Sequence, residues 1–224
     1  MDDMPAPPRE NLSEGTYQVL KAALMRGRFR PGERLKIRDL AAEFCTSVTP
    51  VRDALWRLVQ DDGLEFRSAR DIRVPALSRA DYLEIRAMRV ALEGLAARQA
   101  ATQASAADLD GLALLLTRHE AALAEGEHLD ALSANQEFHL ALAVCAGMPI
   151  LAATLERLWL RMGPLIAQNF GARERGMIEH HYPVLDALRA RDGDAAAMAI
   201  ARDIVEGGKG LLDFLTGAEA QTHD

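Results

Sequence analysis

The chain is poor in cysteine and in aromatic residues, and it contains no long apolar run. Its two cysteines, Cys45 and Cys145, lie far apart and form no CxxC motif, which is typical of a reduced protein and predicts a cytoplasmic location. Aromatic residues make up only 5% of the 224 residues, so any core must rest on Leu, Ala, Val and Ile. No stretch of about 18 apolar residues occurs, so no membrane span is predicted.

The net charge of −7 hides an asymmetry between the two parts of the chain. Residues 11–76 carry 12 Lys and Arg against 9 Asp and Glu, whereas residues 77–224 carry 13 against 21. An acidic total argues against a protein that coats nucleic acid indiscriminately. It leaves room for a small basic face that reads a defined site.

Residues 11–76 show two periodicities in succession. Apolar residues first recur at helical spacing, and Ser47 or Thr49 can cap the third helix, with Pro50 suited to its first turn. After Gly63 the period falls to two, which predicts a short β-hairpin. We therefore expect a winged helix-turn-helix domain, preceded by a disordered tail over residues 1–10. The expected helices cover residues 12–26, 37–44 and 47 or 49 to about 59, and the strands cover 64–67 and 72–74.

Arginines are concentrated on the elements of this domain that would face DNA. A helix-turn-helix inserts its second helix into the major groove, where arginine can pair with guanine edges or with phosphates. Arg52 and Arg57 lie on that helix, and Arg70 lies between the two strands of the wing. The alternative is that these arginines are only solvated surface charges. Their number, on this arrangement of elements, favours DNA binding.

Four segments resemble the N-terminal domain of GntR-type bacterial transcription regulators: PGERL (31–35), LAAEF (40–44), TPVRDALWRL (49–58) and DGL (62–64). The resemblance implies a domain that binds operator DNA as a dimer. The residues that it implies as DNA contacts are Arg34, Ser47, Thr49, Arg52, Arg70 and Asp71.

Two positions depart from the family pattern. Val48 stands where the family has an arginine, and its side chain could contact a thymine methyl group instead. Asp71 stands where the family favours glycine at the tip of the wing. Aspartate tolerates a left-handed conformation better than most residues, so the turn can survive, although a negative charge near phosphate weakens binding.

From Ser78 onward only helical patterns occur, which predicts an antiparallel bundle of about six helices over residues 77–218 and a tail over residues 219–224. The fold class is therefore mainly α. The segments IRAMRVALEGLAARQAA, ANQEFHLALAVCAGMPIL and EHHYPVLDALRARDGDAAAMAIA resemble the FCD ligand-sensing domain of the FadR subgroup. The expected helices are 79–104, 106–125, 129–146, 149–170, 174–190 and 194–216.

The FCD resemblance implies a divalent metal site held by one carboxylate and three histidines. At the matching positions this chain has Asn135, His139, His181 and Asp203, so the carboxylate has moved from the first position to the last. Two imidazoles and one carboxylate suit Zn, Ni, Mn or Fe. The alternative is that both histidines are ordinary core residues. His180 is expected to point elsewhere, and His119, His128 and His223 have no partners at ligand spacing.

Arginine on the first body helix is the predicted contact for an acidic effector. Arg89 precedes Glu93 by four residues, and in the family the arginine at this position often faces the pocket. A guanidinium binds a carboxylate bidentately. A local salt bridge between Arg89 and Glu93 is an equal alternative, and Arg86 is the competing arginine.

These observations predict a homodimeric transcription regulator, a repressor, whose operator affinity responds to a small organic or sugar acid, with a metal as anchor. The alternative is a metal-dependent enzyme built on the helical bundle. Against it, the sequence has no HExxH motif, nucleophile elbow, phosphate loop or dinucleotide signature. Trp159, Met162 and Phe170 are expected to be core or dimer contacts rather than pocket walls.

Overall fold

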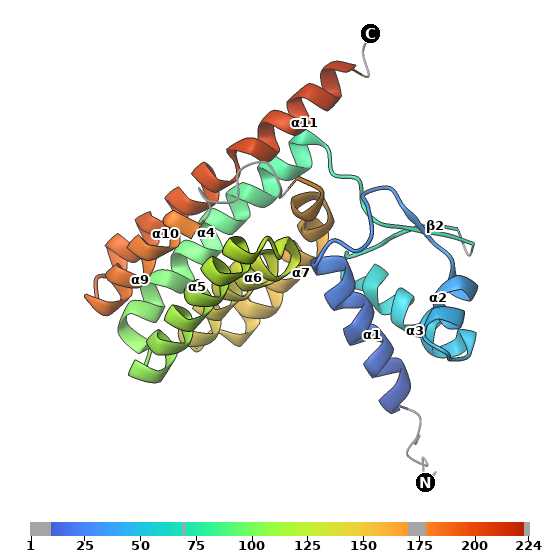
Figure 1. The fold of residues 1–224 in the computed structure, drawn as a ribbon, viewed down its shortest axis with the longest axis horizontal. Coiled ribbons are helices and arrows are strands. Elements are labelled where there is room, and N and C mark those ends of the chain that lie inside the picture. Colours follow the sequence, from blue (N-terminus) through green and yellow to red (C-terminus); the bar gives the residue numbers. More distant parts are fainter. Residues whose placement is uncertain (1–9, 69, 170–177, 222–224) are drawn as a thin grey trace, which may run out of the picture.

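The computed structural model describes residues 10–68, 70–169 and 178–221, which form a small head (residues 10–76) and a larger helical body (residues 77–221). The two parts lie side by side, with α1 of the head against α7 of the body (Figure 1). No helix of the described chain is both long and apolar enough to cross a membrane. The head contains α1 (Glu10–Met25), β1 (Arg34–Leu35), α2 (Ile37–Glu43), α3 (Val48–Gln60), β2 (Glu65–Ser68) and β3 (Asp71–Arg73).

The head is built around the packing of α1 on α3. Leu20 and Leu24 of α1 meet Leu55 and Leu58 of α3 in one fully buried cluster. These positions follow the helical spacing in the sequence, and burial of their side chains drives the packing. The opposite face of α3 is exposed and carries Thr49, Arg52, Asp53, Trp56 and Arg57.

The wing is a three-stranded antiparallel sheet in the order β1-β3-β2, whereas the sequence predicted only two strands. The additional strand β1 pairs Arg34 with Arg73 and Leu35 with Ile72. A strand of two residues is too short to show a periodicity of its own. Asp71 begins β3 and does not have a positive φ, so the hairpin forms without a left-handed conformation at this residue.

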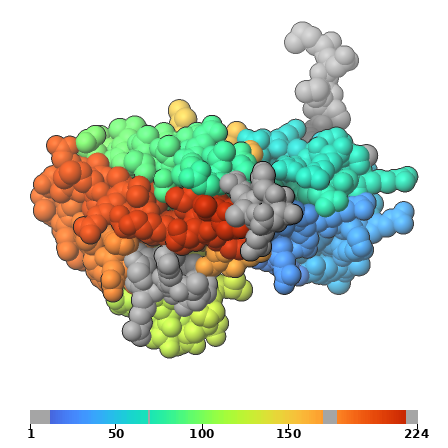
Figure 2. Space-filling view, turned by 90° about the horizontal axis from the view of Figure 1, so that it is seen from above, coloured from blue at the N-terminus to red at the C-terminus, as the bar shows by residue number. Residues whose placement is uncertain are grey.

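The body is a bundle in which small residues allow close contact between helices. Ala96, Ala97, Ala100 and Ala101 of α4 are fully buried, and α10 packs along this helix. Figure 2 shows the C-terminal helices lying alongside α4. The described body helices are α4 (Arg79–Gln103), α5 (Ala106–Glu125), α6 (His128–Cys145), α7 (Pro149–Asn169), α9 (His181–Arg189), α10 (Gly193–Gly207) and α11 (Lys209–Gln221).

The last predicted helix, residues 194–216, is two helices in the structure. α10 ends at Gly207 and α11 begins at Lys209. Two consecutive glycines weaken a helix because their backbone loses much entropy on folding. In addition, the Tyr82 hydroxyl donates a hydrogen bond of 3.1 Å to the carbonyl of Gly208. Of the predicted helix 174–190, residues 174–177 lie outside the described residues.

Helix α7 belongs to both parts of the molecule. Its Leu160 is 1% exposed and lies in the apolar core of the head, while Trp159 and Met162 lie in the core of the body. Two ion pairs flank this contact: Lys21 with Glu156 at 2.6 Å, and Arg157 with Asp61 at 3.3 Å. One side of α7 therefore faces the head and the other faces the interior of the body.

Glycine allows the close approach of α7 to the end of α1. A Cβ at Gly163 would lie 2.8 Å from the carbonyl oxygen and 2.9 Å from the Cα of Met25. On the other side, Gly27 has a φ of +71°, and a Cβ there would overlap the Cβ of Ala167. The backbone of the head thus rests directly on α7.

Candidate functional site

The exposed face of α3 and the tip of the wing form one candidate surface. Ser47 caps α3 through its backbone conformation, but its side chain makes no capping hydrogen bond. Its hydroxyl and that of Thr49 are exposed beside the helix N-terminus, which favours phosphate groups. Arg52 is exposed one turn further along, and it forms no ion pair within the described chain.

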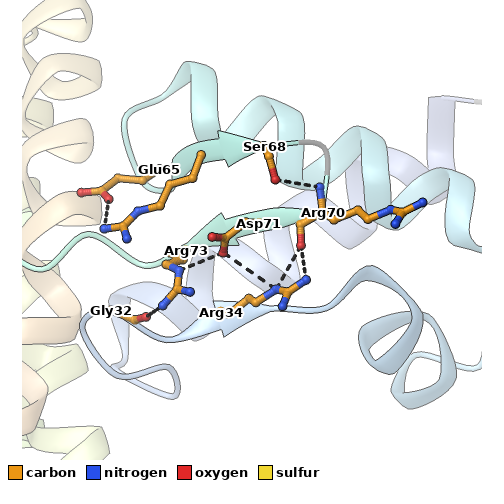
Figure 3. A network of polar contacts seen from close by, with 8 residues as sticks. Gly32, Arg34, Glu65, Ser68, Arg70, Asp71 and Arg73 are labelled. Atoms are coloured by element: carbon orange, nitrogen blue, oxygen red, sulfur yellow. Dashed lines mark hydrogen bonds and ion pairs between the residues drawn. The ribbon is translucent and has the colours of Figure 1, made fainter.

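Arg70 and Arg34 have different surroundings in the wing. The Nε of Arg34 donates to the carbonyl of Arg70 at 3.0 Å and lies 3.8 Å from Asp71. Asp71 also binds Arg73 at 2.8 Å. Figure 3 shows the side chain of Arg70 extending away from this network. The network fixes the backbone at the tip of the wing and leaves the guanidinium of Arg70 exposed.

Arg57, although exposed, is held against α1 of the head. It forms an ion pair with Glu14, and its guanidinium lies 3.9 Å from the ring centre of Tyr17. Trp56, its neighbour, stacks on Phe66 of the wing with ring centres 4.6 Å apart. The sequence analysis did not identify this aromatic pair, which links α3 to β2. Arg57 and Trp56 therefore hold α3 against its neighbouring elements.

A second candidate site is a cavity of about 460 Å³ in the body. His139 of α6 and Asp203 of α10 line its polar end, and His181 of α9, which is not itself a lining residue, converges with them, with one ligand atom of each within 4.8 Å of the others. The Nε2 of His139 lies 3.3 Å from that of His181 and 3.2 Å from Asp203. The Nε2 of His181 lies 3.5 Å from Asp203. Two imidazole nitrogens and a carboxylate facing one point suit a divalent cation.

Glu93 orients His139 from behind. Its Oε2 lies 2.6 Å from the Nδ1 of His139, and its Oε1 accepts a 2.6 Å hydrogen bond from the Nε of Arg89. A carboxylate only accepts, so the Nδ1 of His139 donates to Glu93, and its Nε2 is the nitrogen that faces His181 and Asp203. The 3.3 Å contact between Arg89 and the same Nδ1 is then not a hydrogen bond. The sequence analysis did not predict this role for Glu93.

Burial and neighbouring charges shift the protonation of these groups. Burial alone would raise the pKa of Glu93, but Arg89 and His139 lower it below its usual value. Burial and the nearby His139 lower the pKa of His181 well below its usual value. Burial raises the pKa of Asp203 despite His139 and Arg89. Glu93 is thus ionised and His181 neutral near pH 7, and a neutral imidazole is the form that binds metal.

The position of Arg89 agrees with both alternatives, the pocket-facing arginine and the local salt bridge. It pairs with Glu93 and it lines the cavity, where its guanidinium lies 4.1 Å from the ring centre of Trp159. Arg86 is half-buried and lies against Tyr82, outside the residues that line the cavity. Asn135, one turn before His139, is buried and lines the cavity.

Three further residues differ from what the sequence analysis expected. Trp159 and Met162 line the cavity as well as belonging to the core, so the expected distinction between core and pocket is wrong. His180 also lines the cavity. His119 is fully buried, with its ring centre 6.0 Å from that of His181. Phe170 lies outside the described residues.

Comparison with known proteins identifies the family. Residues 12–74 match the bacterial regulatory proteins of the gntR family, and residues 84–206 match the FCD domain. The chain is 34% identical over 193 residues to the HTH-type transcriptional regulator McbR of Escherichia coli K12, covering 83% of this chain and 87% of that protein. The chain belongs to the GntR family. Its FCD domain places this GntR regulator in the FadR-like subgroup.

Solved structures of GntR regulators share the fold. The structure of E. coli McbR/YncC has a TM-score of 0.85 at 31% identity and covers 91% of this chain and 98% of that one. A putative GntR regulator from Rhodococcus sp. RHA1 has a TM-score of 0.77 at 21% identity, over 90% and 97% of the two chains, which shows the same fold.

The HTH-type transcriptional repressor RspR of E. coli K12 is 23% identical over 201 residues, 89% of this chain and 88% of that protein.

Family membership decides between the two functions that the sequence left open. This GntR regulator is a DNA-binding transcription regulator, and the alternative of a metal-dependent enzyme is not supported. The predicted fold, mainly α with a winged helix-turn-helix head and a helical bundle, is confirmed.

Proposed function

We propose that the chain is a cytoplasmic, homodimeric repressor that binds a palindromic operator and releases it when a small organic or sugar acid enters the body. The name of the relative RspR, a transcriptional repressor, supports the direction of control. Two heads would read half-sites about one helical turn apart. The observation that carries the sensing role is the convergence of His139, His181 and Asp203 at the polar end of the cavity.

Ser47, Thr49, Arg52 and Arg70 are the proposed direct DNA contacts, because their side chains are exposed around the N-terminal half of α3 and the wing tip. Arg34 and Asp71 would support the wing, since both belong to the network that fixes its tip. Arg57 would contribute by packing on α1. Only the outer edge of its guanidinium would contact phosphate. Val48, which is 37% exposed, would contact a thymine methyl group.

His139, His181 and Asp203 would hold a Zn, Ni, Mn or Fe ion, with Asn135 beside them as a neutral oxygen donor. The ion would supply positive charge for an anionic effector. The chain itself supplies little, because Glu93 neutralises Arg89 and Asp203 adds a carboxylate. Acid binding should therefore depend on the metal.

The proposed signal passes through α7. Trp159 and Met162 line the cavity, and Leu160 and Gly163 of the same helix contact the head. An effector shifts the equilibrium only if it prefers one arrangement of α7 and the heads. A coupling of about 1–3 kcal/mol is typical of such switches.

The DNA-reading role is tested by selecting operator sites from a random duplex library and comparing variants on the selected site. Arg52→Ala should weaken binding by roughly 1–3 kcal/mol and relax the preference at one base pair. Arg189→Ala removes one charge from the exposed surface of the body and is the matched control. Full retention of sequence preference by Arg52→Ala would contradict the assignment of α3.

The sensing role is tested by thermal unfolding of chelator-stripped protein with divalent metals and with small carboxylates. A ligand that binds only the folded state raises the midpoint by mass action. We expect a metal to raise it, and an acid to raise it further only with metal present. The Asp203→Asn variant should lose both increases of the midpoint. If an acid raises the midpoint equally without metal, Arg89 rather than the metal would bind its carboxylate.

A further inference from the structure

The cavity beyond the proposed metal ligands has an apolar wall. Side chains from three helices form it, and all but one are at least nine-tenths buried. Phe214, the exception, is 42% exposed although it is large and apolar. The residues of this wall are Trp159, Met162, Ile166, Ile204, Leu211 and Phe214. Below, these six residues are called the apolar wall.

The size of the cavity exceeds that of the smallest acids. A volume of about 460 Å³ corresponds to roughly 15 water-sized volumes of about 30 Å³ each. A two- or three-carbon acid bound at His139 and His181 would leave the apolar wall in contact with water. A ligand that covers this wall gains the free energy of removing apolar surface from water.

Two of the other polar residues around the cavity, which also include Asn169 and His180, are acidic and disfavour a second negative charge near them. Glu206 and Asp213 both line it, and Glu206 forms an ion pair with Lys209. A polycarboxylate would place a further carboxylate near these two. A sugar acid would place several hydroxyls against the apolar wall, and each hydroxyl buried without a partner costs free energy.

We propose that the effector is a monocarboxylic acid with an apolar aliphatic or aromatic tail, whose carboxylate lies at the His139–His181–Asp203 end and whose tail lies on the apolar wall. This inference rests on the proposed effector site and names its ligand class. Gly207 lines the cavity, and a Cβ there would meet no heavy atom within 4 Å. The space beside Gly207 is then available to the tail.

The test is calorimetric titration of the zinc-loaded full chain with acetate, butyrate, hexanoate and octanoate, and with gluconate as a six-carbon polyhydroxy acid. Affinity should rise about fourfold for each added methylene, which corresponds to about 0.8 kcal/mol per buried CH₂. Hexanoate should bind at least tenfold more tightly than gluconate. Flat affinity along the series, or gluconate binding as tightly as hexanoate, overturns the apolar tail.

A cavity-filling variant locates the tail. Gly207→Leu adds a side chain to the cavity surface and should weaken octanoate at least tenfold while leaving zinc binding unchanged. Gly111→Leu is the matched control, because a Cβ at that exposed position of α5 also meets no heavy atom within 4 Å and lies outside the cavity. Unchanged octanoate affinity in Gly207→Leu contradicts the placement of the tail.

The failure of this inference can be told apart from failure of the proposed function. If gluconate binds with zinc and the aliphatic acids do not, the acid-sensing site stands and the ligand class is wrong. If zinc binds and no acid does, both are wrong.

Discussion

At the scale of single residues, Glu93 joins the two halves of the proposed effector site. It is fully buried and binds Arg89 and His139 at once. Loss of its charge would leave Arg89 buried without a counter-ion and free the ring of His139 to rotate. Both effects would alter the polar end of the cavity, although Glu93 is not itself one of the proposed metal ligands.

Glu93→Gln should weaken zinc binding by about 10- to 100-fold, the usual effect of losing a carboxylate behind a ligating histidine. Competition with a chromophoric chelator measures this. Glu137→Gln removes a half-exposed partner of Arg118 and serves as the control. Equal zinc affinities in wild type and Glu93→Gln would show that His139 does not ligate the metal through Nε2.

His119 should make the folded chain sensitive to acid. Burial, and to a lesser extent His139, lower its pKa from 6.5 to about 4. Below pH 6.5 the unfolded chain takes up a proton that the folded chain excludes, so stability is complete above that pH and falls toward about pH 4. His119→Leu should reduce this loss by about 2–3 kcal/mol.

Urea unfolding at several pH values, in chelator, measures that difference. Parallel curves for wild type and His119→Leu would mean that position 119 does not exclude the proton.

The residues that converge as possible metal ligands could be predicted from the sequence, but their support could not. The spacing of Asn135 and His139 places both on one face of α6, and the family pattern pointed to His181 and Asp203. Glu93 is 46 residues from its partner His139. Because this contact depends on how α4 packs on α6, no local sequence pattern predicts it.

At the scale of elements, α7 should tolerate no side chain where it meets α1. Gly163→Val would place a branched side chain against the backbone of Met25, and overpacking of this kind costs about 1–3 kcal/mol. Gly111→Val carries the same change in helix propensity at an open position of α5. Thermal unfolding should show the larger drop for Gly163→Val, and equal drops would contradict the tight contact.

The predictable and the missed elements differ in a physical way. Helices such as α5 have regular apolar spacing, and Ser105 with Asp108 forms a capping box that marks its start. β1 and the break at Gly208 depend instead on partners far along the chain, β3 and Tyr82. Elements that owe their boundaries to tertiary contacts were the ones that sequence patterns missed.

At the scale of the whole molecule, the positive charge of the head and the negative charge of the body orient the approach to DNA. Each phosphate contact contributes a slope of about −0.9 to the dependence of log affinity on log salt concentration. Arg70→Ala should lower the magnitude of this slope by about 1 and weaken all duplexes alike. Arg52→Ala should instead change the ranking of duplex sequences.

Fluorescence anisotropy with selected and scrambled duplexes over a range of salt concentrations separates these effects. An Arg70→Ala variant that discriminates less between duplexes at an unchanged slope would place Arg70 on a base rather than on a phosphate.

The burial of Leu160 in the core of the head has a consequence for protein engineering. A fragment cut after residue 76 would contain every element of the DNA-reading fold but would lack one of its core side chains. Chimeric regulators that join this head to a foreign sensor domain would lack the same core side chain. A successful graft would have to carry the contact surface of α7 with it, so the unit of exchange is larger than the segment that reads DNA.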